Sequence, residues 1–216
     1  NNNNIGIKNL LLNNTNKIQK IDKINLDYID KENLKNKVLI IKKDKNYILK
    51  GETFNVNKLI ENILKSSNKN ENLFSESFKI DINIKKVNLD KNNILKNLEG
   101  FLIFKDNKVS EANLDSSFLS QKKIKFTIKN VNGEKITTFF SGEAKPFVDR
   151  YKFIKGFDEG SLDFSSTSKG NNTNSILKIY DFKLKELPAL TKVLTLASLQ
   201  GIADVLSGEG IRFNEF

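Results

Sequence analysis

Apolar and polar residues alternate along most of this chain with a period of two, the period of a β-strand whose two faces meet different surroundings. The clearest runs are residues 77–85 and 123–129. Their apolar residues fall on one face of each strand: Phe78, Ile80, Ile82 and Ile84 in the first run, and Ile124, Phe126 and Ile128 in the second. The pattern predicts two half-buried strands.

Further strand-like segments are separated by turn signals such as Asn132–Gly133. They are residues 5–12, 18–28, 38–42, 47–54, 98–104, 108–114, 136–140, 162–167 and 175–184. After Lys85 and Lys86 the alternation changes phase, so that Val87 and Leu89 carry the apolar side, which predicts a β-bulge. Together these features predict a mainly β protein: one long antiparallel meander with an apolar face and a Lys/Asn face.

Three segments depart from this period and predict about three helices. Residues 56–66 and 145–154 fit short amphipathic helices, the second with Pro146 in its first turn. Residues 188–207 fit a longer, Leu-rich helix between Pro188 and Gly208. Its apolar surface is wide, so this helix either caps the sheet or meets lipid or a partner.

The amino-acid composition excludes most common types of catalytic site. The 216 residues include no Cys and no His, which excludes thiol nucleophiles, zinc fingers, haem ligation and histidine-based triads. The acidic residues Asp158, Glu159 and Glu209 stand beside glycines, where acidic side chains commonly form turns. We therefore expect no enzymatic activity, no cofactor and no metal site.

The chain also contains no Met. We therefore expect that Asn1 is not the native start and that the chain is a piece of a longer protein, with any leader or membrane anchor outside it. Its apolar stretches are far shorter than the eighteen or so residues that cross a bilayer.

The net charge of +10 comes almost entirely from lysine, since Arg150 and Arg212 are the only arginines. A nucleic-acid site favours Arg, interleaved with aromatic residues that stack on bases. Here the lysines alternate with Ile, Leu and Asn, as on a solvated sheet face. We therefore expect no nucleic-acid partner, and assign the charge to solubility or to a weak attraction toward anionic lipid headgroups.

The C-terminal part of the chain resembles the C-terminal region of AsmA-like bacterial envelope proteins, in particular the YhdP type. The resemblance is carried by FSGEAKPFVDRYKFIKGFDEGSLDF at residues 140–164 and by residues 177–213, and it is strongest over 135–216. Within the second stretch, TLASLQG at 195–201 and LSGEG at 206–210 match a helix and the turn after it. The matching positions are Pro188, Leu194, Leu196, Leu199, Gly201, Leu206, Gly208 and Gly210.

The resemblance implies that the long antiparallel sheet is curled and groove-like, with an apolar interior, and that residues 1–216 form a single β-groove segment. It implies a periplasmic location, in a protein anchored to the inner membrane of a Gram-negative bacterium, and a role in phospholipid transport and outer-membrane homeostasis. The family offers no catalytic motif. With phospholipid as the expected partner, six apolar residues of the two clearest runs become candidates for lining the groove: Ile80, Ile82, Ile84, Ile124, Phe126 and Ile128. Each of them could equally be an ordinary core residue.

Two alternatives remain at this level. A structural module of the envelope could recruit protein partners by pairing an exposed strand edge, and would have a packed, lipid-free interior. An outer-membrane barrel fits less well, because the chain has no Trp and only four Tyr from which to build aromatic girdles.

Overall fold

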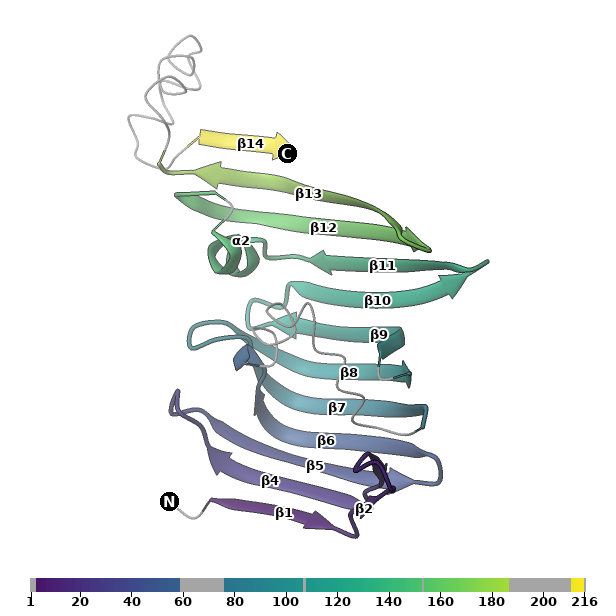
Figure 1. Ribbon diagram of the computed structural model, residues 1–216. Helices are drawn as coiled ribbons and strands as arrows, with labels where there is room; N and C mark the ends of the chain where they lie inside the picture. Colours follow the sequence, from purple (N-terminus) through teal and green to yellow (C-terminus); the bar gives the residue numbers. More distant parts are fainter. Residues whose placement is uncertain (1–2, 59–75, 107, 153, 187–210, 216) are drawn as a thin grey trace.

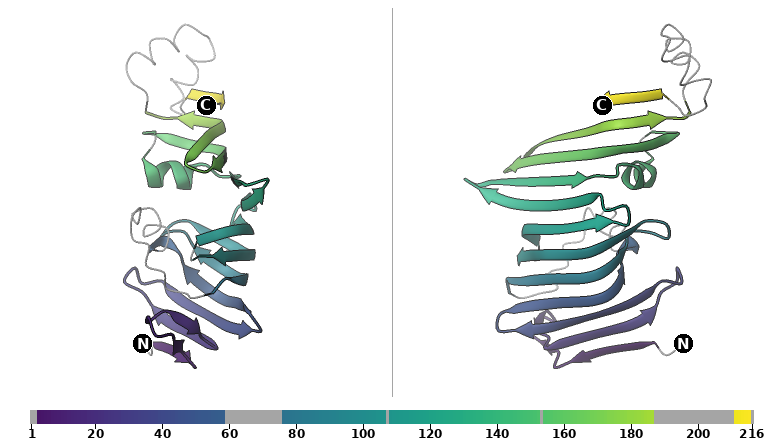
Figure 2. Two further views of the ribbon diagram at one scale, coloured as in Figure 1. Left: turned by 45° about the vertical axis from the view of Figure 1, so that its right-hand side comes forward. Right: turned by 180° about the vertical axis from the view of Figure 1, so that it is seen from behind.

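The computed structural model describes residues 3–58, 76–106, 108–152, 154–186 and 211–215 (Figure 1). About 69% of these residues lie in strands, so the prediction of a mainly β protein is confirmed. Twelve strands form one long sheet that twists along its length and does not close on itself (Figures 1 and 2). Two short strands, β2 (Leu11–Leu12) and β3 (Ile18–Lys20), form a separate pair.

The strands of the long sheet follow one another in space almost in chain order. From one edge to the other they are β1 (Asn4–Lys8), β4 (Lys23–Ile29), β5 (Lys35–Lys43), β6 (Asn46–Asn55), β7 (Phe78–Asn88), β8 (Ile94–Lys105), β9 (Lys108–Phe118), β10 (Lys123–Val131), β11 (Glu134–Ser141), β12 (Phe157–Lys169), β13 (Asn172–Leu184) and β14 (Ile211–Glu215).

The sheet is mostly, but not wholly, antiparallel. β6 and β7 run parallel, with Leu49 opposite Ile82, and this corrects the prediction of an entirely antiparallel sheet. A parallel pair needs a long crossover, here residues 56–77, whereas short turns join most of the antiparallel neighbours. The predicted helix 56–66 falls in this crossover, and its residues 59–66 lie outside the described residues.

Three neighbouring strands carry an extra residue at the same level. These residues are Glu52 in β6, Lys85 in β7 and Asn97 in β8. Pairing among the three strands stays in register across this level. The register shifts only at the outer pairs, β5 with β6 and β8 with β9. The three strands therefore have their bulges side by side, and they bend at the same position.

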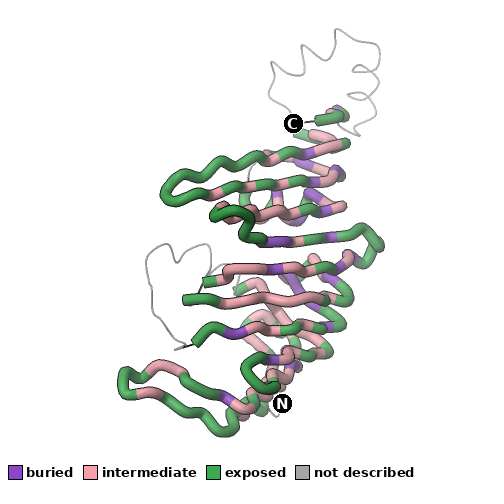
Figure 3. Tube along the Cα trace, turned by 90° about the vertical axis from the view of Figure 1, so that its right-hand side faces the viewer, coloured by how far each residue is buried: buried purple, intermediate pink, exposed green. Residues whose placement is uncertain are grey.

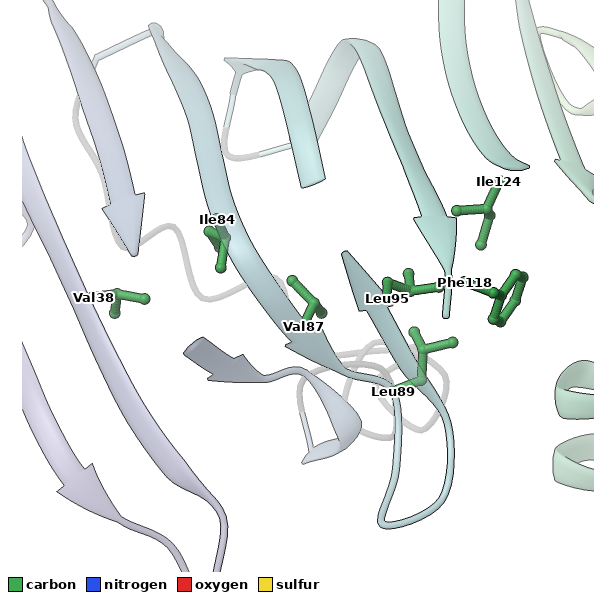
Figure 4. Close-up of a cluster of buried hydrophobic side chains, with 7 residues drawn as sticks. All are labelled: Val38, Ile84, Val87, Leu89, Leu95, Phe118 and Ile124. Atoms are coloured by element: carbon green, nitrogen blue, oxygen red, sulfur yellow. The ribbon is translucent and has the colours of Figure 1, made fainter. Parts of the chain in front are cut away.

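The bulges confirm the change of phase predicted after Lys85. Ile84 and Val87 lie three residues apart, yet both are buried in one cluster, at 2% and 1% exposure. Figure 4 shows the cluster, which draws side chains from β5, β7, β8, β9, β10 and the turn after β7. Its members are Val38, Ile84, Val87, Leu89, Leu95, Phe118 and Ile124.

A second cluster lies farther along the sheet, around β12, β13 and the helix α2 (Lys145–Tyr151). Its members are Ala144, Val148, Phe157, Leu162, Ile179 and Phe182. Ile179 and Phe182 are again three residues apart and both buried, because β12 and β13 change phase together where Gly160 and Asp181 adopt positive φ. Buried residues gather in these regions, whereas the hairpin tips are exposed (Figure 3).

The helix predicted at 145–154 is confirmed as α2, with Pro146 in its first turn and Lys152 in the left-handed conformation at its end. The predicted Leu-rich helix 188–207 lies outside the described residues. Among the residues that are described, no helix combines the length and the apolar character needed to cross a membrane.

Candidate functional site

Both apolar clusters lie on one face of the sheet, called here the inner face. Phe139 on β11 and Phe147 on α2 pack against both clusters and so connect them. The two rings meet edge to face, with their centroids 4.9 Å apart. Figure 2 shows α2 lying against one side of the sheet. The inner face is therefore apolar over much of its length.

The cross-strand register aligns apolar side chains of the inner face into a single line across eleven strands, from β1 to β13. We call this line the apolar row. Its members, each directly opposite the next, are Ile7, Ile24, Ile40, Leu49, Ile82, Gly100, Leu114, Phe126, Phe139, Phe164 and Leu177. It contains no ionisable side chain. Ten steps of about 4.8 Å between strands make it about 48 Å long.

The apolar row remains accessible. Ile7 is exposed at 56%, and the other members are all partly exposed rather than buried. The adjacent row, two residues along each strand, is buried over most of its length. We call it the buried row, and it contains Val38 (4% exposed), Ile84 (2%), Ile124 (8%), Leu162 (3%) and Ile179 (1%). The buried row also contains Ser116 and Ser141, on either side of Ile124, so the two rows differ in polarity as well as in whether a ligand can reach them.

The six predicted lining residues all lie on the inner face, in three adjacent rows. Ile82 and Phe126 belong to the apolar row, and Ile84 and Ile124 to the buried row. Ile80 and Ile128 share a third row with Leu102 and Ala112 between them. Ile80 is partly exposed, whereas Ile128 is buried at 7% exposure. Accessible lining positions among the six are therefore Ile80, Ile82 and Phe126.

Gly100 is the one position in the apolar row without a side chain, and the backbone explains it. Its φ is 137°, and a Cβ placed there would lie 1.9 Å from the carbonyl oxygen of Asn113 on β9. Only glycine allows this close approach of the two strands. The gap therefore comes from strand packing.

The opposite, outer face is rich in ion pairs, with exposed apolar side chains such as Ile41, Phe140 and Ile176 among them. A hollow of about 350 Å³ lies over β10–β13 on this face, and its lining includes Phe140 and Ile176. Two lysines at its rim already have partners: Lys125 Nζ lies 3.3 Å from Asp115, and Lys178 Nζ lies 2.5 Å from Glu215, which raises the pKa of Lys178. Across the described part of the chain, no group of three or more acidic side chains could hold a metal ion.

Some candidate residues cannot be placed. The motif positions from Pro188 to Gly210 all lie outside the described residues. Conversely, the sequence interpretation omitted most of the apolar row, including Leu49, Leu114 and Phe164, because strand periodicity gives the face of a residue but not its neighbours on other strands. It also assigned no role to Arg150, although the rarity of arginine in this chain was a usable signal.

Comparison of this chain with protein-family models, with curated proteins and with solved structures found no match.

Proposed function

We propose that this chain is a non-catalytic lipid-binding segment that shields phospholipid acyl chains along the apolar row. The observation that supports this most is the row itself: an uncharged and accessible line of apolar side chains that crosses eleven strands, with a glycine in place of a side chain only on β8. An apolar sheet face must be covered by another element or by a ligand. An acyl chain laid along the row is such a ligand.

The dimensions and the energetics are suited to acyl chains. A bilayer core is about 30 Å thick, so the chains of one leaflet span about 15 Å, roughly a third of the row. Burying a methylene contributes about 0.8 kcal/mol, and a dozen methylenes therefore contribute on the order of 10 kcal/mol before ordering costs. Because the row repeats similar side chains, neighbouring positions bind with similar energy, and a lipid can move along it without chemistry.

The resemblance to AsmA-like envelope proteins extends this proposal to the cell. The segment then belongs to a periplasmic protein anchored in the inner membrane, and its inner face forms part of a groove that carries phospholipid between the two membranes.

The proposal is tested by native mass spectrometry of the chain purified without detergent, after incubation with phosphatidylethanolamine–phosphatidylglycerol vesicles. Wild-type protein is expected to carry phospholipid, and Phe126→Asp and Ile82→Asp to lose most of it. The matched control is Phe140→Asp, an exposed position on the outer face of β11. Circular dichroism verifies that each variant folds. Lipid-free wild-type protein, or equal lipid in Phe126→Asp, Ile82→Asp and Phe140→Asp, contradicts the proposal.

A second candidate is a scaffolding module that recruits a protein strand to the edge of the sheet. It is favoured by β1, an edge strand whose Ile5 and Ile7 are 62% and 56% exposed. Exposed apolar edge strands invite pairing with another strand. This candidate predicts that Gly6→Pro, which removes a backbone donor from β1, abolishes partner binding and leaves lipid content unchanged.

A further inference from the structure

Hydrogen-bonded side chains connect three loops at one end of the sheet. Asp30, in the turn after β4, accepts hydrogen bonds from the amides of Asn36 (3.1 Å) and Asn55 (2.7 Å). Glu32 of the same turn accepts from Asn55 (3.2 Å) and from Asn57 (2.8 Å), which follows β6. The side chain of Asn57 is therefore held in place from the β4–β5 turn.

Arg150 joins helix α2 to this network. Its Nη2 atom donates to Oδ1 of Asn57 at 3.0 Å and to the carbonyl oxygen of Leu89, and it lies 4.0 Å from the carboxylate of Asp90. The Arg150 side chain is only 15% exposed. These partners are 93, 61 and 60 positions away along the chain, so a single guanidinium ties the last turn of α2 to the ends of β6 and β7.

The other end of α2 is attached to β12. The Ala144 backbone N–H donates to the Gly160 carbonyl at 2.9 Å, and the Lys145 ammonium donates to the Phe157 carbonyl at 2.8 Å. Between these attachments, Val148 is fully buried in the second cluster and Phe147 packs against both clusters. Between its two attachments, the helix thus lies over Leu162 of the buried row and against Phe139 of the apolar row.

We propose that Arg150 is a positioning residue that holds α2 against Leu162 of the buried row and Phe139 of the apolar row, and so limits how much acyl chain this part of the inner face can take up. This inference rests on the proposed function. Loss of the Arg150 contacts frees the last turn of α2, and Phe147 and Val148 withdraw from the face. Leu162 then becomes reachable and Phe139 becomes more exposed, so this part of the inner face takes up additional acyl chain.

The test compares Arg150→Ala with Arg212→Ala. Arg212, the only other arginine, is 51% exposed and pairs with Glu159 at 3.3 Å on the far side of the second cluster. Two quantities are measured: hydrogen exchange of the Val148 amide, which donates to the Ala144 carbonyl, and the amount of phospholipid retained from phosphatidylethanolamine–phosphatidylglycerol vesicles. Arg150→Ala is expected to raise the exchange rate about tenfold or more and to raise bound lipid roughly twofold.

Arg212→Ala is expected to change neither quantity. Arg150→Lys, which keeps a cationic donor, is expected to recover part of the wild-type behaviour. Unchanged Val148 exchange in Arg150→Ala overturns the inference, and so does faster exchange with unchanged lipid, which is the result for a purely structural contact. Absence of lipid from wild type and all variants instead refutes the proposed function, so the two failures are distinguishable.

Discussion

At the scale of single residues, Ile82 and Ile84 show how two positions on the same face of one strand acquire different roles. Ile84 is 2% exposed and packs among Val38, Val87 and Leu95, whereas Ile82 remains partly exposed beside the cluster. The face of a residue is set by strand periodicity. Its accessibility is set by what covers that part of the face, which for the buried row includes α2.

Stability measurements separate the two kinds of position. Ile84→Ala leaves a cavity in a closed cluster and is expected to lower the free energy of unfolding by about 2–5 kcal/mol. Ile7→Ala, at the exposed end of the apolar row, is expected to change it by less than about 0.5 kcal/mol. Denaturant titration of both variants checks this, and equal destabilisation would show that the row is packed like the core.

Acid is expected to weaken the network around Asp30. Burial alone would raise the pKa of Asp30, but hydrogen bonds donated by Asn55, Asn36 and two backbone N–H groups outweigh burial and lower this pKa below 3.8. The stabilisation is therefore fully present above about pH 4, the range of an unfolded Asp, and is lost as the pH falls through the folded-state pKa.

Thermal unfolding of wild type and of Asp30→Asn between pH 6 and pH 3 tests this expectation. The unfolding temperature of wild type should exceed that of Asp30→Asn at pH 6, and this excess should disappear as the pH falls below about 4. Asp30 becomes protonated in that range, whereas the asparagine of the variant does not titrate. A difference in unfolding temperature that stays constant between pH 6 and pH 3 would exclude Asp30 as a source of acid sensitivity.

At the scale of elements, the bulged strands β6, β7 and β8 show what the sequence can and cannot predict. The phase change in β7 was predictable, because Lys85 and Lys86 interrupt a strict alternation. That Glu52 and Asn97 are bulged at the same level depends on register, which the sequence of one strand does not contain. The parallel pairing of β6 with β7 was missed for a related reason. A half-buried strand alternates apolar and polar residues in the same way whether its neighbour runs parallel or antiparallel to it.

Gly100 provides the sharpest test of how β8 and β9 pack. Gly100→Ala is expected to destabilise the protein by more than about 1 kcal/mol, because a Cβ would collide with the Asn113 carbonyl and φ is positive. Gly6→Ala in β1 is the control, since nothing lies within 4 Å of a Cβ at that position. Comparable midpoints of urea unfolding for the two variants would contradict this view of the β8–β9 contact.

At the scale of the whole molecule, the apolar row appears only when eleven strands are placed in register. The mainly β fold, the positions of most strands, helix α2 and the apolar face were predictable from local pattern. The alignment of Ile24 with Phe164 along one row depends on contacts between residues far apart in the chain, and so does the attachment of α2 through Arg150 to Asn57. The candidate site was therefore predictable as a face, and only in part as individual residues.

The measurement that tests the central claim most directly is photo-crosslinking from neighbouring residues on opposite faces of β11. A photoreactive benzoylphenylalanine replaces either Phe139, in the apolar row, or Phe140, on the outer face, and the protein is irradiated with phosphatidylethanolamine–phosphatidylglycerol vesicles. Lipid adducts at position 139 and few at position 140 are the predicted result. Equal labelling at the two positions, or no labelling at position 139 in folded protein, would contradict lipid binding along the apolar row.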